Sequence, residues 1–506
     1  MRNSFRLFGL ALPLLAGIAW WGQPTNSYSS SPEREMRGVW MATVLNIDYP
    51  SYPTQNAATL QAEFRSQLGR LKRIGINTVF LQVRPASDAL YKSNLAPWSK
   101  WLTGQQGVAP NSDFDPLAFA IEEAHHQGIE LHAWINPYRA AMDLDSLSLA
   151  GNHVFYQHRD WVRIYGNRMY LDPGLPQVQT HLLDIVDELV MNYDLDGIHF
   201  DDYFYPYPIE GQEFPDSMTY LQYGQDFPEQ ASWRRNNVNE LVARIYQRIQ
   251  DHKPWVQFGI SPFGVWRNQS DDPRGSATQA LSTSYDGLYG DALRWAADGT
   301  VDYLMPQLYW SIGYEPADYQ HLLEWWSENT DPKVQVYIGQ AAYKVGNNHD
   351  IRWDDLEQIP RQIDLNRRNN RISGSVFFSA KSLLQSTVEF DQRLADVYIE
   401  PVLMPERLNP YGQPPSPPKL RRVRQKERGP MLVWEVDKNV PDSRIPYYFA
   451  IYRSTAGGEL RLLDVSPLGQ GCRLYHYFDE TAEEGVDYDY VVRAMDRWHR
   501  QSVALP

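Results

Sequence analysis

Two adjacent carboxylates follow a short apolar segment, and they are the side chains best suited to acid–base or nucleophilic chemistry. The eight residues from Asp196 read Asp-Gly-Ile-His-Phe-Asp-Asp-Tyr, which predicts a buried strand running into an acid pair. Strand side chains alternate between two faces, so Asp201 shares the inward face with His199 and Tyr203. Alternation turns Asp202 to the other face unless the strand ends before it. We therefore expect Asp201 to be the nucleophile or base and Asp202 to be a supporting acid.

Eight strand patterns alternate with helical patterns and must position these acids. The predicted strands cover residues 37–44, 77–83, 129–135, 196–200, 256–260, 301–308, 334–339 and 374–378. This repetition predicts the α/β class and a (β/α)8 TIM barrel, which we assign to residues 33–404. Several connections after the strands are long, and a barrel carries its site on that face. A doubly wound open sheet is the competing arrangement, but no glycine-rich phosphate loop follows the first strand.

Other predicted strands also end in polar or aromatic side chains that alternation directs inward. A barrel with no site at its mouth would fill these layers with Val, Ile and Leu. Aromatic ring faces cover the C–H patches of sugars, and amides and carboxylates bond sugar hydroxyls, so a polysaccharide is the expected partner. The side chains that we expect to bind it are Arg84, Asn136, Tyr138, His199, Tyr203, Gln307, Tyr309 and Trp310.

The N-terminal segment has the pattern of a targeting sequence. Arg2 and Arg6 precede an apolar run that ends at Trp21, a length typical of a signal peptide and short for a membrane span. We assign residues 1–32 to a signal peptide or N-terminal anchor followed by a linker. The protein is therefore expected to be exported, to the periplasm or outside the cell, with cell-wall association.

Composition excludes one class of partner. The chain carries 47 Lys and Arg against 62 Asp and Glu, a formal net charge of −15. Nonspecific binding of nucleic acid needs a positive surface, so we expect no nucleic-acid partner. Cys472 is the only cysteine of the sequence, so no internal disulfide can form.

The C-terminal part of the chain has a different pattern from the barrel region. Six prolines predict a stiff linker at residues 405–418. Short alternating segments then predict a small all-β sandwich at residues 419–506. Trp434, Tyr452 and the segment 488–494 resemble the core tryptophan and tyrosine-corner strand of fibronectin type III domains.

Five motifs, in order along the chain, resemble the glycosyl hydrolase-like 10 family of exported bacterial barrel proteins. The resemblance spans about residues 35–390 and implies hydrolysis of O-glycosyl bonds in a bacterial polysaccharide, with cell-wall (peptidoglycan) glycan the leading expectation. The matching segments are Arg37-Gly38-Val39-Trp40 and residues 82–91, 132–138, 196–203 and 305–310.

Glycoside hydrolysis needs a second carboxyl group beside Asp201, one that protonates the leaving oxygen. Barrels of the α-galactosidase clan resemble this chain in placing an Asp nucleophile at the end of strand four. Their acid follows strand six, where this sequence has Gln307 and Tyr309. Asp88, four residues after Arg84, is the other candidate near the mouth, so the sequence leaves the acid partner unidentified.

Three further interpretations concern the catalytic mechanism and the function. Relative to the chitinase signature, His199 and Tyr203 replace the first and last acids. A chitinase-type proton donor is therefore missing, and we do not expect a substrate-assisted mechanism of the chitinase kind. A non-catalytic glycan-binding barrel is an alternative function. A metal-dependent hydrolase using His132, His199 and Asp201 is a third, but no ligand cluster has standard spacing, so we expect no metal and no cofactor. Both histidines are better explained as hydrogen-bonded interior side chains. Oligomeric state stays open.

Overall fold

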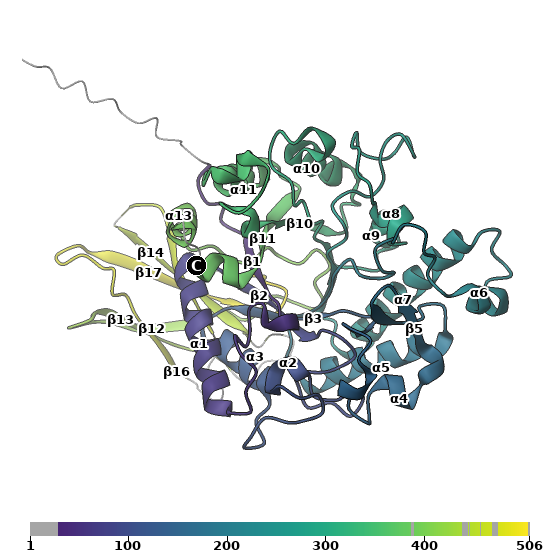
Figure 1. Ribbon diagram of the computed structural model, residues 1–506. Helices are drawn as coiled ribbons and strands as arrows, with labels where there is room; N and C mark the ends of the chain where they lie inside the picture. The colour runs from purple at the N-terminus through teal and green to yellow at the C-terminus, as the bar shows by residue number, and fades with distance from the viewer. Residues whose placement is uncertain are drawn as a thin grey trace, which may run out of the picture.

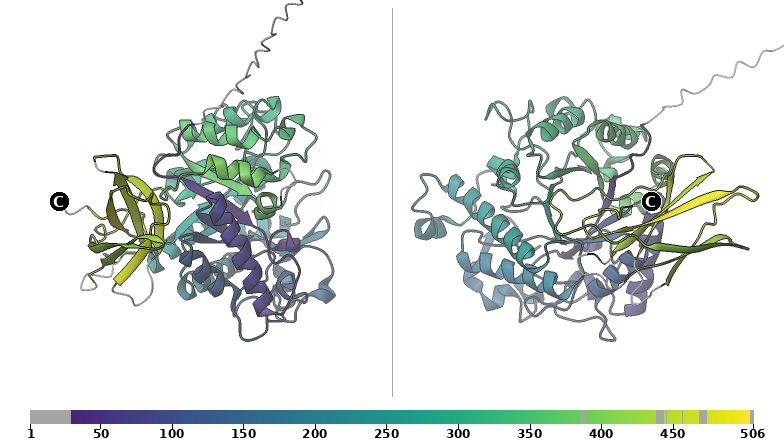
Figure 2. Two further views of the ribbon diagram at one scale, coloured as in Figure 1. Left: turned by 90° about the vertical axis from the view of Figure 1, so that its left-hand side faces the viewer. Right: turned by 180° about the vertical axis from the view of Figure 1, so that it is seen from behind.

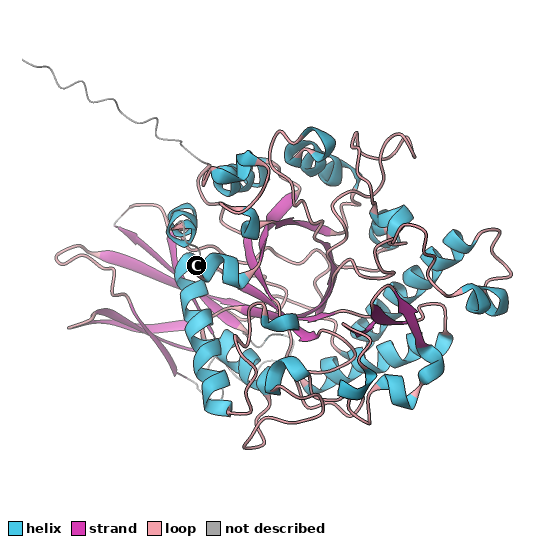
Figure 3. Ribbon diagram, viewed as in Figure 1, coloured by secondary structure: helices cyan, strands magenta, loops and turns pink. Residues whose placement is uncertain are grey.

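A closed barrel of parallel strands forms the main body of the protein. The computed structural model describes residues 29–385, 389–437, 444, 446–455, 457–467 and 474–503. Within this part of the chain, the barrel strands are β1 (Met36–Met41), β2 (Thr78–Arg84), β3 (Glu130–Ile135), β7 (Gly197–Phe200), β8 (Gln257–Ile260), β9 (Tyr303–Leu304), β10 (Gln335–Gln340) and β11 (Ile372–Phe378). They close in the order β1-β11-β10-β9-β8-β7-β3-β2. Figures 1 and 3 show the barrel strands at the centre of the molecule, with helices around them. The predicted TIM barrel is confirmed.

One barrel strand is much shorter than its sequence pattern predicts. The apolar run 301–308 forms only the two-residue β9. Pro306 has no N–H to donate to a ladder, which interrupts the strand. Gln307 resumes the pairing through isolated bridges to Phe263 and Gly339, so the chain continues along the barrel wall to its mouth.

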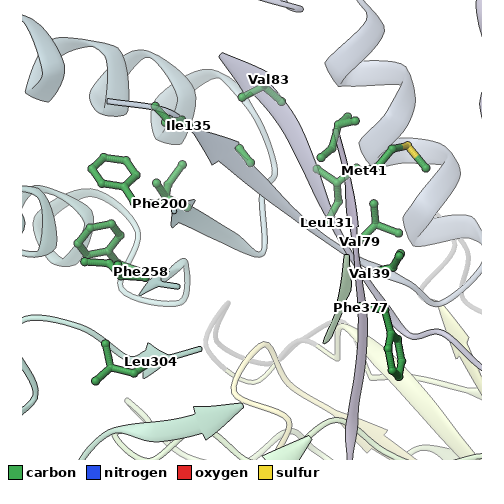
Figure 4. Packing of buried hydrophobic residues seen from close by; sticks show 14 of the residues in the cluster. Val39, Met41, Val79, Val83, Leu131, Ile135, Phe200, Phe258, Leu304 and Phe377 are labelled. Carbon is green, nitrogen blue, oxygen red and sulfur yellow. The ribbon is translucent and has the colours of Figure 1, made fainter. Parts of the chain in front are cut away.

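Helices cover the outside of the barrel because each presents one apolar stripe to the strands. In α1, the buried side chains Leu60, Phe64, Leu68 and Leu71 recur at helical spacing. They belong to one buried cluster with the outward-facing side chains of the strands, which include Val39, Val79, Leu131 and Phe200 (Figure 4). The covering helices are α1 (Ala57–Ile74), α3 (Pro116–His126), α5 (Pro176–Asn192), α7 (Gln230–His252), α9 (Ala292–Asp298), α10 (Tyr319–Asn329), α11 (Gln358–Arg368), α12 (Ala380–Leu384) and α13 (Phe390–Val397).

The connections after the strands carry structure of their own. The connection after β3, which the sequence pattern indicates only as a long loop, contains a small antiparallel sheet in the order β4-β6-β5. Its strands alternate too briefly for a sequence pattern to separate them from a loop. The additional elements of these connections are α2 (Lys100–Thr103), β4 (Arg139–Ala141), α4 (Val154–Gln157), β5 (Val162–Tyr165), β6 (Arg168–Leu171), α6 (Ser217–Tyr223) and α8 (Ser284–Gly287).

Aromatic and polar side chains fill the barrel interior, as alternation predicts. The inward cluster includes Trp40, Phe80, Trp134, Tyr303 and Tyr337, all of them buried. Glycine makes room for these large rings. A Cβ atom added at position 259 of β8 would lie only 2.0 Å from the ring of the inward tyrosine on β9.

The two inward histidines belong to a hydrogen-bonded chain inside the barrel. Trp40 Nε1 donates to His199 Nε2 (3.1 Å), and Tyr303 Oη lies 3.0 Å from both His199 Nδ1 and His132 Nδ1. Because His199 Nε2 accepts, the proton of its neutral ring is on Nδ1. Burial and the neighbouring His132 lower the pKa of His199 well below its ordinary value. The interpretation of both residues as interior histidines is confirmed.

The C-terminal region forms two three-stranded antiparallel sheets that share one core. One sheet has the order β12-β13-β16 and the other β15-β14-β17. Trp434, Phe449, Tyr475 and Ala494 pack together between the sheets. The predicted all-β character is confirmed, while the fibronectin type III likeness stays a prediction. The strands are β12 (Lys419–Lys426), β13 (Gly429–Glu435), β14 (Tyr448–Thr455), β15 (Arg461–Pro467), β16 (Leu474–Phe478) and β17 (Tyr488–Met495).

This sandwich packs against one end of the barrel (Figure 2). His499 Nε2 bonds Glu130, the first residue of β3, and Arg497 lies 2.8 Å from Asp194, which precedes β7. These contacts lie at the amino ends of the strands, so the carboxyl ends stay open.

The expected targeting segment and Cys472 fall largely outside the described residues. Within those residues, every helix is too short or too polar to span a bilayer.

Candidate active site at the carboxyl ends of the barrel strands

A cavity of about 470 Å³ opens at the carboxyl ends of the barrel strands. Its walls combine aromatic rings, two carboxylates and three cationic side chains. Sugar-binding sites commonly pair apolar ring faces with a few convergent polar groups. The principal lining residues are Trp40, Gln82, Trp134, Arg139, Arg168, Asp201, Asp202, Tyr203, Tyr207, Ser261, Phe263, Gln307, Tyr309, Trp310, Tyr343, Lys344 and Phe378.

Asp201 directly follows β7, and three hydrogen-bond donors fix the position of its carboxylate. Trp134 Nε1 donates to Oδ2 at 3.1 Å, and Asn136 Nδ2 donates to the same oxygen. The backbone N–H of Tyr203 donates to Oδ1 at 3.3 Å. The side chain is almost wholly buried, and burial raises the pKa of Asp201 to about 7. The charge of Arg139 opposes this rise, since a nearby cation favours the ionised carboxylate.

Asp202 lines the same cavity because β7 ends at Phe200 and alternation no longer governs the side chains beyond it. Its carboxylate accepts a hydrogen bond from Tyr207 Oη, and Gln307 also bonds it. Burial raises the pKa of Asp202 above its ordinary value. Across the described residues, Asp201 and Asp202 are the only carboxylates of the lining. From the sequence we expect the acid partner of Asp201 to come from another part of the chain. Among the described residues, however, Asp202 is the only other carboxylate of the cavity.

Asp88, the third candidate acid, lies behind the cavity wall. It is buried, accepts a hydrogen bond from the backbone N–H of Ala86 at 3.1 Å, and is absent from the lining. Ser99 and Gln106 also donate to it, although burial raises its pKa to about 6. Its cationic neighbour is Arg84, as the sequence suggests. These contacts give Asp88 a place in the loop interior, away from the cavity.

Arg84 turns away from the mouth because β2 and β3 change register between Gln82 and Arg84. Such a bulge re-aims the side chain that follows it. The Arg84 guanidinium is buried and donates to the carbonyl oxygens of Asn136 (3.1 Å) and Pro137 (3.2 Å). Gln82, two residues earlier on the strand, lines the cavity. The expected substrate contact of Arg84 is therefore replaced by a contact that holds the end of β3.

Three more of the expected binding residues are fully buried and lie outside the cavity lining: Asn136, Tyr138 and His199. Asn136 acts on Asp201 instead, and it accepts a hydrogen bond from Gln82 Nε2 at 2.6 Å. Alternation identifies the inward face of a strand but not the depth along the barrel axis, which explains the difference. The remaining four, Tyr203, Gln307, Tyr309 and Trp310, do line the cavity.

The cations of the site are the feature that sequence reasoning missed. Arg139 begins β4 and Arg168 begins β6, so both come from the small sheet after β3. The Arg139 guanidinium lies over the ring of Tyr203, 4.7 Å from its centroid. Lys344 reaches the cavity from the connection after β10 and donates to Tyr309 O at 2.6 Å. Arg139 directly follows a recognised motif, whereas Arg168 gives no local signal.

Comparison with known proteins places the chain in a family of glycosyl hydrolase-like proteins. Residues 35–355 match the family Glycosyl hydrolase-like 10. Glycosyl hydrolase YngK of Bacillus subtilis (strain 168) is 42% identical over 484 residues, covering 94% of this chain and 93% of YngK. Glycosyl hydrolase DigH of Escherichia coli (strain K12) is 42% identical over 376 residues, covering 70% of this chain and 84% of DigH.

Among solved structures, the glycoside hydrolase domain of PgaB (BpsB) from Bordetella bronchiseptica has a TM-score of 0.46 at 12% identity, covering 72% of this chain and 99% of that one. The sequence relationship is much stronger, since it extends over nearly the full length of one relative at 42% identity. The chain belongs to the glycosyl hydrolase-like 10 family.

Proposed function

We propose that the protein hydrolyses O-glycosyl bonds in a bacterial polysaccharide, with cell-wall (peptidoglycan) glycan as its substrate. One observation carries the proposal: two adjacent buried carboxylates with raised pKa values face one aromatic-walled cavity at the barrel mouth. Buried acids with perturbed pKa values in a cleft suit general acid–base work near neutral pH.

The hydrogen-bond partners of the two acids suggest different roles. Asp201 receives only donors, from Trp134, Asn136 and a backbone N–H, and donors favour the ionised carboxylate. Asp202 is bonded by the hydroxyl of Tyr207, which can also accept a hydrogen bond from a protonated acid. We therefore assign Asp201 the ionised role and Asp202 the role of proton donor to the leaving oxygen. As neighbours they titrate as a pair.

The charge of the cavity supports an anionic glycan. Arg139, Arg168 and Lys344 line it, so its cationic side chains outnumber the two carboxylates among the described residues, and burial raises the pKa values of both acids. A cation-lined cleft concentrates anionic substrates even when the whole protein carries net negative charge. Peptidoglycan glycan carries carboxyl groups, which would match these side chains.

Release of new reducing ends from purified cell-wall glycan tests the proposal. Asp201→Asn and Asp202→Asn are each expected to reduce the rate by on the order of 100-fold or more, because each removes one half of the acid–base pair. Asp88→Asn is the matched control: it changes a buried aspartate with a raised pKa that lies outside the cavity. Thermal melts establish that all three variants fold.

Two alternatives have their own outcomes in the same experiment. If the wild type binds glycan without releasing products, the barrel is a glycan-binding module. If Asp201→Asn matches the wild type, the proposed catalytic site is wrong.

A metal-dependent hydrolase finds no support among the described residues, where no group of three or more His, Cys, Asp and Glu side chains could hold a metal. Stoichiometric zinc in the purified protein would contradict a metal-free mechanism. Export stays a proposal that cell fractionation can test.

A further inference from the structure

The placement of Asp201 and Asp202 poses a geometric problem for direct hydrolysis. Displacement at the anomeric carbon needs a proton donor at the leaving oxygen and a nucleophile or activated water on the opposite face of the sugar. The two acids are consecutive residues, with Cα atoms about 3.8 Å apart, and both follow β7. They therefore approach a bound sugar from the same wall of the cavity.

Among the described residues that line the opposite wall, none is a carboxylate that could take the second position. In the barrel order, β11 lies across from β7, with β1 and β10 beside it. β1 contributes Trp40 to the lining, β11 contributes Phe378, and the connection after β10 contributes Tyr343 and Lys344. Burial raises the pKa of the Tyr343 phenol, which keeps it protonated and weakly nucleophilic.

Asp48 is a buried acid between the connection after β1 and the end of β11, and its oxygens are already occupied. Oδ2 accepts from the backbone N–H of Ala42 at 2.7 Å. Oδ1 accepts from Ser379 Oγ at 2.7 Å and from the backbone N–H of Lys381 at 2.6 Å. Asp48 thus ties the connection after β1 to the end of β11, and it is not part of the described cavity lining. In the part of the chain that the structure describes, the cavity therefore has acids on one wall and no carboxylate on the opposite wall.

We propose that the substrate supplies the missing nucleophile, as a 2-acetamido group on the sugar whose bond is cleaved. This inference rests on the proposed glycosidase function and narrows it to glycans of 2-acetamido-2-deoxy sugars. The acetamido oxygen of such a sugar lies beside its own anomeric carbon and can attack from the face opposite the leaving group, so a single wall of acids suffices.

The steps balance with the two acids alone. In the first, the acetamido oxygen forms a bond to C1 while the C1–O glycosidic bond breaks. The leaving oxygen takes the proton of Asp202, and the acetamido N–H proton passes to Asp201, which leaves a neutral oxazoline. In the second, Asp202 accepts a proton from water as the water oxygen bonds C1 and the oxazoline C1–O bond breaks. Asp201 returns its proton to the nitrogen, so both acids regain their starting states and the anomeric configuration is retained.

The contacts of Asp201 suit the N–H-accepting role. Trp134 and Asn136 both bond Oδ2, which fixes the carboxylate plane. Oδ1 has only the longer 3.3 Å bond from the Tyr203 N–H and stays available to a ligand. Trp134 and Tyr203 also line the cavity, where their rings would bracket the acetamido methyl group.

Four forms of one glycan preparation test the inference with the full-length protein. The forms are the N-acetylated glycan, its N-deacetylated product, the product re-N-acetylated, and the product N-trifluoroacetylated. Deacetylation should reduce the hydrolysis rate by on the order of 100-fold or more, and re-N-acetylation should restore it. The trifluoroacetyl form keeps a neutral amide of similar size but has a weaker oxygen nucleophile. It should be cleaved at least about tenfold more slowly than the acetyl form, an effect on kcat rather than KM.

Other outcomes separate this inference from the proposed function. Equal kcat values for the acetyl and trifluoroacetyl forms would overturn the acetamido nucleophile while leaving the glycosidase intact. Inverted product configuration, read by proton NMR early in the reaction, would do the same, as would a covalent glycosyl adduct on Asp201 seen by mass spectrometry. Failure of the wild type to cleave any form would overturn the proposed function and this inference together.

Discussion

Trp134→Phe is expected to move the acidic limb of the pH–rate profile to higher pH. Trp134 Nε1 donates to the buried carboxylate of Asp201 at 3.1 Å, and phenylalanine keeps an aromatic ring but not the N–H. The lost bond stabilises the ionised carboxylate and not the protonated acid. Its removal therefore raises the pKa of Asp201, and activity that needs the ionised form falls on the acidic side.

The size of the shift follows from the hydrogen bond. A bond to a charged group contributes about 1.5–3 kcal/mol, and one pKa unit corresponds to about 1.4 kcal/mol. Asn136 bonds the same oxygen and compensates in part, so we take the lower bound of about one unit. The pKa of Asp201 is already raised to about 7 by burial, so the variant's limb should lie near 8. At a pH below the Asp201 pKa of both enzymes, kcat/KM of the variant should be about tenfold lower than that of the wild type. At a pH above both pKa values, kcat/KM should change little.

The assay is kcat/KM on cell-wall glycan from pH 5 to 10. Trp40→Phe is a matched control, because it removes an indole N–H from the same cavity, but that N–H donates to His199 instead of Asp201. Its acidic limb should stay in place even if its KM rises. The assignment of Asp201 as the ionised group would be refuted if the acidic limb of the pH–rate profile did not move in Trp134→Phe. It would also be refuted if the limb moved equally in both variants.

Three further predictions concern charge, docking and packing. Arg168→Gln should raise KM about tenfold for glycan that carries carboxyl groups, through loss of one charge-assisted contact, and should leave KM unchanged for the carboxyl-reduced glycan; equal effects on both would contradict the anion contact. His499→Ala should lower the free energy of unfolding in urea by about 3 kcal/mol, because it removes a partner of the buried Glu130 carboxylate, and an unchanged midpoint would rule this out. Gly259→Ala should destabilise the protein by about 1–3 kcal/mol in the same assay, because its Cβ would lie 2.0 Å from the Tyr303 ring.

The barrel was predictable because its strands and helices follow local periodicities. Alternation along β7 correctly separates the apolar side chains that face helices from the inward His199, and the same rule finds Gln307 and Tyr309 at the mouth. Where the backbone departs from regular geometry, the rule stops working. A bulge turns Arg84 aside, and the end of β7 at Phe200 brings Asp202 into the cavity.

Other site features arise from contacts between distant segments and leave no local pattern. Arg168 reaches the cavity on a short strand of an accessory sheet, some thirty residues beyond Asn136. The docking of His499 on Glu130 joins residues 369 positions apart in the chain. Neither contact produces a periodicity or a spacing in the sequence from which it could be predicted.

The amino-acid order alone was enough to predict the barrel, the family resemblance and the position of Asp201 at a strand end, because hydrophobic alternation and helix periodicity are short-range properties. Which acids share a cavity became clear only from the folded chain. Asp202 enters it and Asp88 does not, and no carboxylate stands across from Asp201 among the described residues. That arrangement depends on how deep each side chain lies along the barrel axis and on how the long connections converge. Both are set by packing between segments far apart in the chain.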